Sequence, residues 1–178
     1  MRLPVIGLSA FLIGLVAAHA VVLNALPGYI MSKARERMTD SGIPVHQWRM
    51  SPRITPETQT VVRPSPDLAY AICVIDVSNG PVTLTVPTWP EYGSLSIFDA
   101  STDNVYAGSL DARLPGAPGV RTIIVALEGE TGDTAEGSDV VSLKKPEALA
   151  LIRRLAPSQG LYEAAAALVP VSSCGPAR

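Results

Sequence analysis

Four aspartates lie near the ends of predicted β-strands, where two of their carboxylates could meet. They are Asp67, Asp76, Asp99 and Asp103. Two carboxylates held close together can act as a general acid and base, or bind a metal ion. Capping of turns explains each aspartate equally well, because the short carboxylate accepts hydrogen bonds from nearby backbone N–H groups. We favour this structural role.

The candidate binding residues combine some of these aspartates with aromatic and amide side chains. The set predicted to contact a ligand or a partner is Asp67, Tyr70, Tyr92, Asp99, Asp103 and Asn104. Tyr70 and Tyr92, together with Trp89, could line an apolar pocket. Because only 5% of the residues are aromatic, we favour all three as anchors of the core. We assign no catalytic residue and predict no cofactor.

The sequence lacks the motifs of the commonest enzyme classes. It contains no G-x-S-x-G elbow, H-E-x-x-H helix, P-loop or G-x-G-x-x-G turn. Of the two histidines, His19 lies in an apolar segment, so a histidine-based site would depend on His46 alone. We expect His46 to be solvated or locally bonded, and an enzyme is less expected than a protein without catalytic activity.

An acidic segment between residues 128 and 139 contains five carboxylates and no lysine or arginine. Such a cluster could hold a hard cation such as calcium. It lacks the ligand order of an EF-hand loop, and its three glycines are typical of a surface loop. We therefore favour a solvated loop and predict no metal site.

The two cysteines, Cys73 and Cys174, are too far apart for a C-x-x-C metal or redox unit. A bond between them would imply an extracytoplasmic location, and would stabilise the fold by at most about 4 to 5 kcal/mol in the chain-entropy model. Because Ile72 and Val74 flank Cys73, we favour a buried, unbonded thiol and keep the disulfide as the alternative.

The segment from Leu3 to Leu26 contains no Asp, Glu, Lys or Arg. As a helix it would be about 36 Å long, enough to cross a hydrocarbon core of about 30 Å. We predict a transmembrane anchor. A cleaved signal peptide is the alternative, because Ala18 to Ala20 matches the small-residue cleavage pattern. The apolar run continues past that point to Leu23, which favours the anchor.

The charges around this segment leave its orientation open. Lys33, Arg35 and Arg37 follow it and a single arginine precedes it, so the positive-inside rule would place the soluble part in the cytoplasm. We expect instead a single pass through the inner membrane with the soluble domain in the periplasm. The reasons are a family resemblance given below, and Glu36, which partly offsets these charges on a predicted helix over residues 28–39.

The rest of the 178-residue chain is the size of one ordinary domain. A hydrophobic content of 47%, with 16 prolines, favours short aliphatic strands joined by turns. We divide the chain into an anchor (1–27), a juxtamembrane connector (28–57), a β-rich domain (58–157) and a C-terminal helix and tail (158–178). A net charge of -2 and the lack of a basic stripe argue against nucleic-acid binding.

Alternating β-branched segments predict six strands. These are residues 69–77, 82–86, 94–99, 105–109, 120–127 and 140–143. Asn79-Gly80 predicts a hairpin between the first two, and the spacing favours an antiparallel sandwich or barrel. Helical composition follows Pro146, so we predict a helix over 147–155 and a second, short helix over 161–168.

Three blocks of sequence are similar to one bacterial family. They are Arg63 to Tyr70, Asp76 to Pro87, and Tyr92 to Asp99. In the middle block an Asp-x-Ser-x-Gly-Pro-Val turn leads into a Leu-x-Val-Pro strand. Over residues 58–155 the chain resembles the bacterial domain-of-unknown-function 1254 family. It departs from that family at Gly93, where Trp is usual, and at Ser65-Pro66, where Asn is common.

The resemblance implies a β-rich, barrel-like domain that is usually exported. In longer members a second β domain follows, of the domain-of-unknown-function 1214 type. We expect this chain to lack that domain and to pair with a separately encoded partner that carries it. The expected function is a membrane-anchored binding or assembly module. An envelope enzyme acting on a small apolar molecule and a structural envelope protein are the alternatives.

Overall fold

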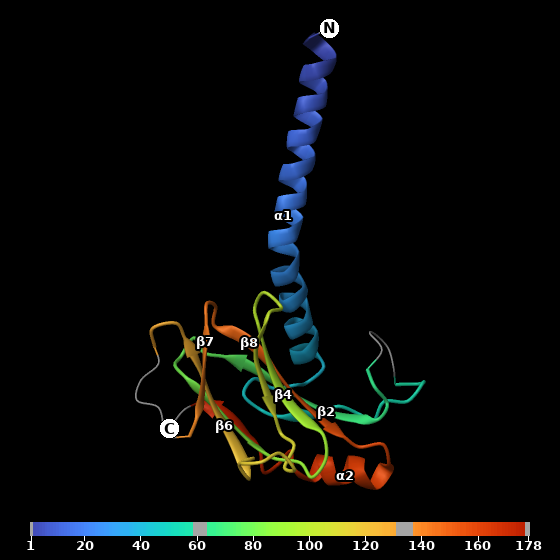
Figure 1. Ribbon diagram of the computed structural model, residues 1–178, viewed down its shortest axis with the longest axis vertical. Helices are drawn as coiled ribbons and strands as arrows, with labels where there is room; N and C mark the ends of the chain where they lie inside the picture. The colour runs from blue at the N-terminus through green and yellow to red at the C-terminus, as the bar shows by residue number, and fades with distance from the viewer. Residues whose placement is uncertain (1, 59–63, 131–136, 177–178) are drawn as a thin grey trace.

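The computed structural model describes residues 2–58, 64–130 and 137–176, and consists of a long helix and a β-sandwich (Figure 1). The helix, α1 (Arg2–Asp40), projects from one end of the sandwich. A short second helix, α2 (Gln159–Ala167), lies at the opposite end. The mostly β class with a short C-terminal helical segment is confirmed.

The first sheet has five strands in the order β1-β2-β8-β4-β5, and all of its neighbours are antiparallel. Their bounds are β1 (Arg49–Met50), β2 (Leu68–Asp76), β8 (Glu147–Leu155), β4 (Gly93–Asp99) and β5 (Asn104–Ser109). The central strand β8 pairs with β2 on one side and with β4 on the other, so β2 and β4 run in the same direction.

The second sheet has four strands in the order β7-β6-β3-β9. Their bounds are β7 (Asp139–Leu143), β6 (Val120–Leu127), β3 (Val82–Pro87) and β9 (Ser173–Pro176). One pair, β6 and β7, is parallel, so the sheet is mixed and not purely antiparallel.

The core lies between the two sheets, where aliphatic side chains alternate with outward-facing ones along each strand. On β3, for example, Val82, Leu84 and Val86 are all fully buried. Strands of both sheets contribute to one continuous apolar cluster, as expected for sheets that pack face to face.

Residues 147–155 form strand β8, and the helix predicted there is wrong. Its alanines and leucines favour a helix locally, but the strand pairs along its whole length with β2 and along most of it with β4. Alternation buries Ala148, Ala150 and Ile152 in the core. Pairing on both sides and burial outweigh the small differences in helix propensity.

The hairpin predicted between the first two strands is also wrong, because β2 and β3 belong to different sheets. The turn itself has the expected chemistry, with Gly80 at a φ of 118°. The backbone N–H of Val77 donates to the carbonyl of Pro146, next to β8, before the chain crosses to the other sheet. Local turn residues therefore predict the reversal but not the strand that is paired.

Helix α1 runs without interruption through Pro27 and absorbs the short helix predicted over 28–39. Its exposed N-terminal part is long and apolar enough to cross a membrane, with a mean hydropathy of 2.4. Its last turns pack on the five-stranded sheet, where Met31 is buried against Val74 and Leu149. The residues of α1 that pack on the sheet are C-terminal to both the predicted span and the alternative cleavage point. This packing therefore fits a membrane anchor and a cleaved signal peptide equally well.

Helix α2 confirms the short C-terminal helix predicted over 161–168. Ser158 caps its N-terminus by accepting a hydrogen bond from the backbone N–H of Leu161. Ala165 on its inner face is buried in a small cluster with Ala69 and Trp89. Gly93 lies next to the same cluster. A Cβ there would lie 3.0 Å from the Cβ of Leu110 and 3.3 Å from that of Trp89, so a larger residue would force these side chains to move.

Candidate functional site

The six predicted binding residues do not gather at one site. The first group, at the starts of β2 and β4, is Asp67, Tyr70 and Tyr92. The second group, at the end of β4 and the start of β5, is Asp99, Asp103 and Asn104. The seven residues of β4 separate the two groups by roughly 20 Å. Asp67 and Tyr70 therefore do not surround the same substrate as Asp99 and Asp103, as the predicted enzyme site would require.

The aromatic residues of the first group differ in their environments. Trp89 is 4% exposed and its Nε1 donates to the carbonyl of Leu155, so its role as a core anchor is confirmed. Tyr92 is 47% exposed, and the prediction that it anchors the core is wrong. Tyr70 is half-buried and its hydroxyl accepts a hydrogen bond from the backbone N–H of Ser65. Sequence pattern alone did not separate these three environments.

The aspartates at the other end serve mainly as turn caps. Asp99 Oδ1 accepts hydrogen bonds from the backbone N–H groups of Ser101 at 2.7 Å and Asp103 at 3.0 Å. The capping role is therefore confirmed for Asp99, whereas Asp103 and Asn104 are exposed. Asp67, in the first group, is exposed as well, and its backbone carbonyl accepts from Ala156.

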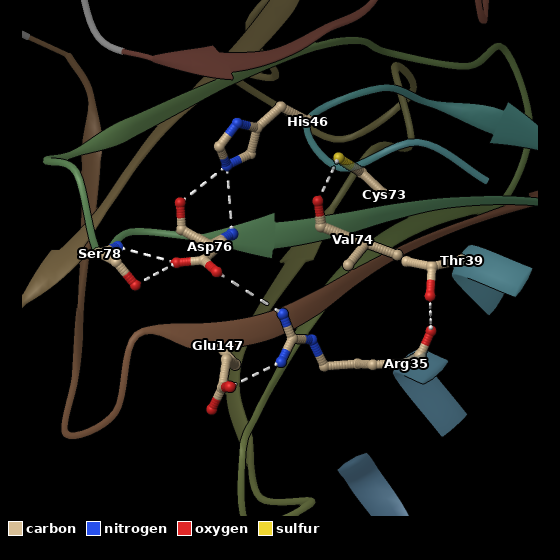
Figure 2. Close-up of polar contacts among 8 residues, drawn as sticks. All are labelled: Arg35, Thr39, His46, Cys73, Val74, Asp76, Ser78 and Glu147. Carbon is tan, nitrogen blue, oxygen red and sulfur yellow. Dashed lines mark hydrogen bonds and ion pairs between the residues drawn. The ribbon is translucent and has the colours of Figure 1, made fainter. Parts of the chain in front are cut away.

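A polar cluster joins helix α1 to the five-stranded sheet (Figure 2). Arg35 on α1 lies 2.9 Å from Glu147 at the start of β8, and 3.9 Å from Asp76 at the end of β2. The Ser78 hydroxyl donates to Asp76 at 2.5 Å. That hydrogen bond, together with the nearby guanidinium, lowers the pKa of Asp76. The two carboxylates hold the base of the helix against the sheet.

His46 belongs to the same cluster and is locally bonded, as expected. Its Nε2 lies 2.8 Å from the backbone carbonyl of Asp76 and 3.2 Å from the backbone nitrogen of the same residue, so the tautomer decides whether Nε2 donates to the carbonyl or accepts from the N–H. The Ser78 hydroxyl donates to the Asp76 carboxylate and not to the imidazole. Ser78, His46 and Asp76 thus do not form a nucleophile, base and orienting acid in sequence. The cluster is suited to positioning the helix, not to covalent chemistry.

A second polar cluster was not predicted. Tyr106 on β5 donates its hydroxyl proton to Asp139 on β7 at 2.6 Å, and Arg121 on β6 binds the same oxygen at 2.9 Å. Burial, and then the hydrogen bond to Asp139, raise the pKa of Tyr106 to about 12. The hydrogen bond from Tyr106 and the guanidinium of Arg121 lower the pKa of Asp139. The cluster links β5, an edge strand of the five-stranded sheet, to β6 and β7 of the four-stranded sheet.

Tyr106, Arg121 and Asp139 are far apart in sequence, so the residue pattern of each strand alone did not predict that they form a cluster. The local sequence pattern gave the opposite signal. Val105 and Ala107 are apolar, yet the structure exposes both of them, and Tyr106 between them points inward to Asp139.

Cys73 and Cys174 form a disulfide, and the favoured unbonded thiol is corrected. The flanking aliphatic residues correctly indicated burial, since Cys73 is 0% exposed. These flanking residues could not show where Cys174 lies. Its strand, β9, pairs with β3 in the opposite sheet, and this long-range pairing turns Cys174 inward toward Cys73. The bond therefore joins β2 of the first sheet to β9 of the second.

The acidic segment lies partly outside the described residues, which omit 131–136. Within the described ranges, no group of three or more His, Cys, Asp or Glu side chains is placed to hold a metal ion. The last residue of the acidic segment, Asp139, accepts hydrogen bonds from Tyr106 and Arg121.

Within the described ranges, the outward-facing side chains of the four-stranded sheet are all uncharged, while Arg121 and Asp139 on its strands lie toward Tyr106 of the other sheet. We call this outer surface the uncharged face, and its central outward residues are Thr83, Thr85, Thr122, Ile124, Val140, Ser142, Ser173 and Gly175. The Thr85 and Ser173 hydroxyls lie 2.6 Å apart across β3 and β9. Val140 on the edge strand is 42% exposed.

The chain matches the family model described as "Protein of unknown function (DUF1254)" over residues 45–173. The chain belongs to the DUF1254 family. The match begins in the connector and reaches the start of β9, so the family's domain includes both sheets and α2.

Solved structures show the fold of this DUF1254 chain. It is similar to the VPA0106 protein from Vibrio parahaemolyticus, with a TM-score of 0.62, 18% identity, and coverage of 86% of this chain and 37% of that one. It thus spans little more than a third of that protein. An uncharacterized protein from Burkholderia cenocepacia matches at a TM-score of 0.37, 12% identity and coverage of 54% and 28%, too distant to support an argument. No curated protein matches.

Proposed function

We propose that this DUF1254 chain is a membrane-anchored extracytoplasmic binding or assembly module, which pairs with a second β domain carried by a separate chain. The observation that carries the proposal is the uncharged face of the four-stranded sheet.

The long apolar part of α1 supports a membrane anchor. The disulfide between Cys73 and Cys174 supports an oxidising compartment, and so a periplasmic domain held at the inner membrane. The positive-inside rule points the other way through Lys33, Arg35 and Arg37. We give the disulfide more weight, because thiols in a reducing cytoplasm do not stay bonded.

The composition of the uncharged face supports a protein partner. The centres of protein interfaces are depleted in charged residues, and a second sheet can stack on such a face about 10 Å away. Threonine is also common on solvated sheets, but here Ile124 on the inner strand β6 and Val140 on the edge strand β7 add apolar area. The solved Vibrio protein extends far beyond the shared fold, which agrees with a DUF1254 fold that is found next to further structure.

Capture of the full-length chain from native membranes tests this proposal. The tagged chain is solubilised in mild detergent, and its co-purifying proteins are quantified by mass spectrometry. Val140→Glu places a charge on the uncharged face. Ala107→Glu places the same charge at an exposed position on β5, the edge strand of the other sheet, and is the matched control.

We expect one β-domain protein in near-stoichiometric amount with the wild type and with Ala107→Glu. We expect it to be lost with Val140→Glu, since a buried unpaired carboxylate costs several kcal/mol at an interface. A folded chain that is recovered alone and monomeric would contradict the pairing. Equal loss of the partner in both variants would indicate that the partner does not bind through the uncharged face.

A further inference from the structure

Two small pockets share one lysine, Lys145, at the end of the sandwich next to α1. The first has a volume of about 170 Å³, and its polar lining is Ser32, Arg35, Lys145 and Glu147. The second has a volume of about 280 Å³, and its charged lining is Asp99, Asp103, Glu128, Lys144 and Lys145. Lys145 therefore stands between two polar pockets.

The two pockets differ in the sign of their charge. The first has two cations, Arg35 and Lys145, and one carboxylate, Glu147, which Arg35 already binds at 2.9 Å. The second has two lysines and three carboxylates. Among the described residues, neither Lys144 nor Lys145 forms an ion pair. A ligand spanning both pockets would thus meet positive charge on one side and negative charge on the other.

Two further residues that line the first pocket can donate hydrogen bonds. Arg35 directs Nη1 at Glu147 and Nη2 at Asp76, while its buried Nε donates to no acceptor within the described part of the chain. A guanidinium binds an anionic oxygen through charge-assisted hydrogen bonds. The Ser32 hydroxyl lines the same pocket.

The position of the pockets along α1 places them at the membrane surface. Gly28 and Ser32 follow Leu26, the last residue of the predicted span, by two and six residues, or about 3 and 9 Å along the helix. The headgroup layer extends about 5 to 8 Å beyond the hydrocarbon core. A Cβ on Gly28 would lie 3.7 Å from the carbonyl of Ala100, so the turn after β4 lies at the same depth.

We propose that these two pockets bind the headgroup of a zwitterionic phospholipid with a primary ammonium, of the phosphoethanolamine type. The phosphate lies at Lys145 with Ser32 and Arg35 as further donors, and the ammonium lies toward Asp103 and Glu128. The inference rests on the membrane-anchor part of the proposed function. It gives the turns after β4 and β7 a role as a surface that orients the domain on the bilayer.

Native mass spectrometry of lipid retention tests the assignment. The full chain is reconstituted in nanodiscs of equal parts phosphatidylethanolamine, phosphatidylglycerol and phosphatidylcholine, and is then released into detergent. We expect phosphatidylethanolamine to be retained about tenfold over the other two, the factor that corresponds to one charge-assisted hydrogen bond. Lys145→Gln and Asp103→Asn should each remove most of this preference. Lys33→Gln, on an exposed lysine that pairs with Glu36 and lines neither pocket, should retain it.

Two results would overturn the inference alone. One is retention of phosphatidylglycerol at or above phosphatidylethanolamine, which would mean that only an anion is recognised. The other is an equal effect of Lys33→Gln and Lys145→Gln. Release of the chain from bilayers by alkaline carbonate would overturn the anchor as well. The pairing through the uncharged face is measured separately, so its failure would leave these lipid results unchanged.

Discussion

The two sheets share one core but have opposite outer surfaces. On the five-stranded sheet, the outward residues Val74 and Leu149 are buried beneath Met31 of α1, and ion pairs border the contact. On the four-stranded sheet, the uncharged face has Val140 42% exposed at its edge. A strand alternates between core and surface, so one sandwich can assign each outer surface a separate task. Here one sheet holds α1, and our proposal assigns the other to a partner.

The disulfide is the covalent tie between these two sheets, and its removal has the largest expected effect. Replacing Cys73 and Cys174 together by alanine should lower the free energy of unfolding by about 4 kcal/mol, because the bond closes a loop of about 100 residues. Denaturant titration of the full chain in detergent, followed by tryptophan fluorescence, measures this. The reduced wild type should behave like the double variant. Unchanged stability would show that the sheets hold together without the bond.

A carboxylate placed on each outer surface would test the difference between them. Met31→Glu puts a charge into the contact between α1 and the five-stranded sheet, where Met31 is 6% exposed. We expect a loss of about 2 to 4 kcal/mol and faster proteolysis of the connector. Val140→Glu, on the uncharged face, should change stability by less than about 0.5 kcal/mol. Similar losses in both variants would contradict the comparison.

Adjacent arginines on β8 offer a sharper contrast between inside and outside. Arg154 is 2% exposed, and its Nη2 donates to the Pro87 carbonyl while its Nε has no partner among the described residues. Burial lowers its pKa to about 10. Arg153 faces outward and donates to the hydroxyl of Ser96.

Arg154→Met should therefore raise the free energy of unfolding by about 1 to 3 kcal/mol at pH 7, as the charge no longer has to be buried. Arg153→Met should change it by about 0.5 kcal/mol or less. Above pH 10 the folded Arg154 loses its proton while the unfolded chain, with its ordinary and higher arginine pKa, still holds it, so wild-type stability rises with pH and the gain from Arg154→Met shrinks. Chemical denaturation across pH measures both effects. A loss of stability in Arg154→Met would indicate that the Pro87 contact outweighs the cost of burial.

The sequence predicted most strands because alternation and turn residues are local signals. Residues 120–127 form β6 as predicted, and 82–86 form all but the last residue of β3. Residues 147–155 were assigned to a helix because their alanines and leucines have no strand signal of their own. Their strand structure depends on β2 and β4, which pair with them from elsewhere in the chain. The assignment of strands to sheets is likewise a property of long-range pairing.

The candidate sites were predicted less well than the fold, for the same reason. Asp99 was recognised as a turn cap because its partners lie within four residues. Arg35 was considered only as a charge beside the membrane, although its partner Glu147 is more than 100 residues away. Tyr106 and Asp139 were assigned to separate elements, and only the closing of the sandwich brings them together.

The hydrogen bond from Tyr106 to Asp139 is the polar tie between the sheets, as the disulfide is the covalent one. Tyr106→Phe removes the hydroxyl and leaves the ring in place, so we expect a loss of about 1 to 2 kcal/mol at pH 7, the cost of one charge-assisted hydrogen bond. Tyr92→Phe is the control, since Tyr92 is 47% exposed and its hydroxyl has one long hydrogen bond among the described residues, to the Ser94 hydroxyl at 3.4 Å. Thermal unfolding of the three proteins gives the difference.

The stabilisation by the hydrogen bond from Tyr106 should decrease at high pH, and this is the smallest effect that we expect. The unfolded tyrosine ionises near its ordinary pKa of 10, whereas in the fold the pKa of Tyr106 is about 12. Above pH 10 the unfolded state loses its proton first, so the contribution of Tyr106 to stability is complete below pH 10 and declines as the pH approaches 12. The difference between wild type and Tyr106→Phe should therefore shrink over this range, while the difference for Arg154→Met shrinks for the opposite reason, a gain in the wild type. A difference that stays constant for Tyr106→Phe would mean that the phenol does not tie the edges of the two sheets.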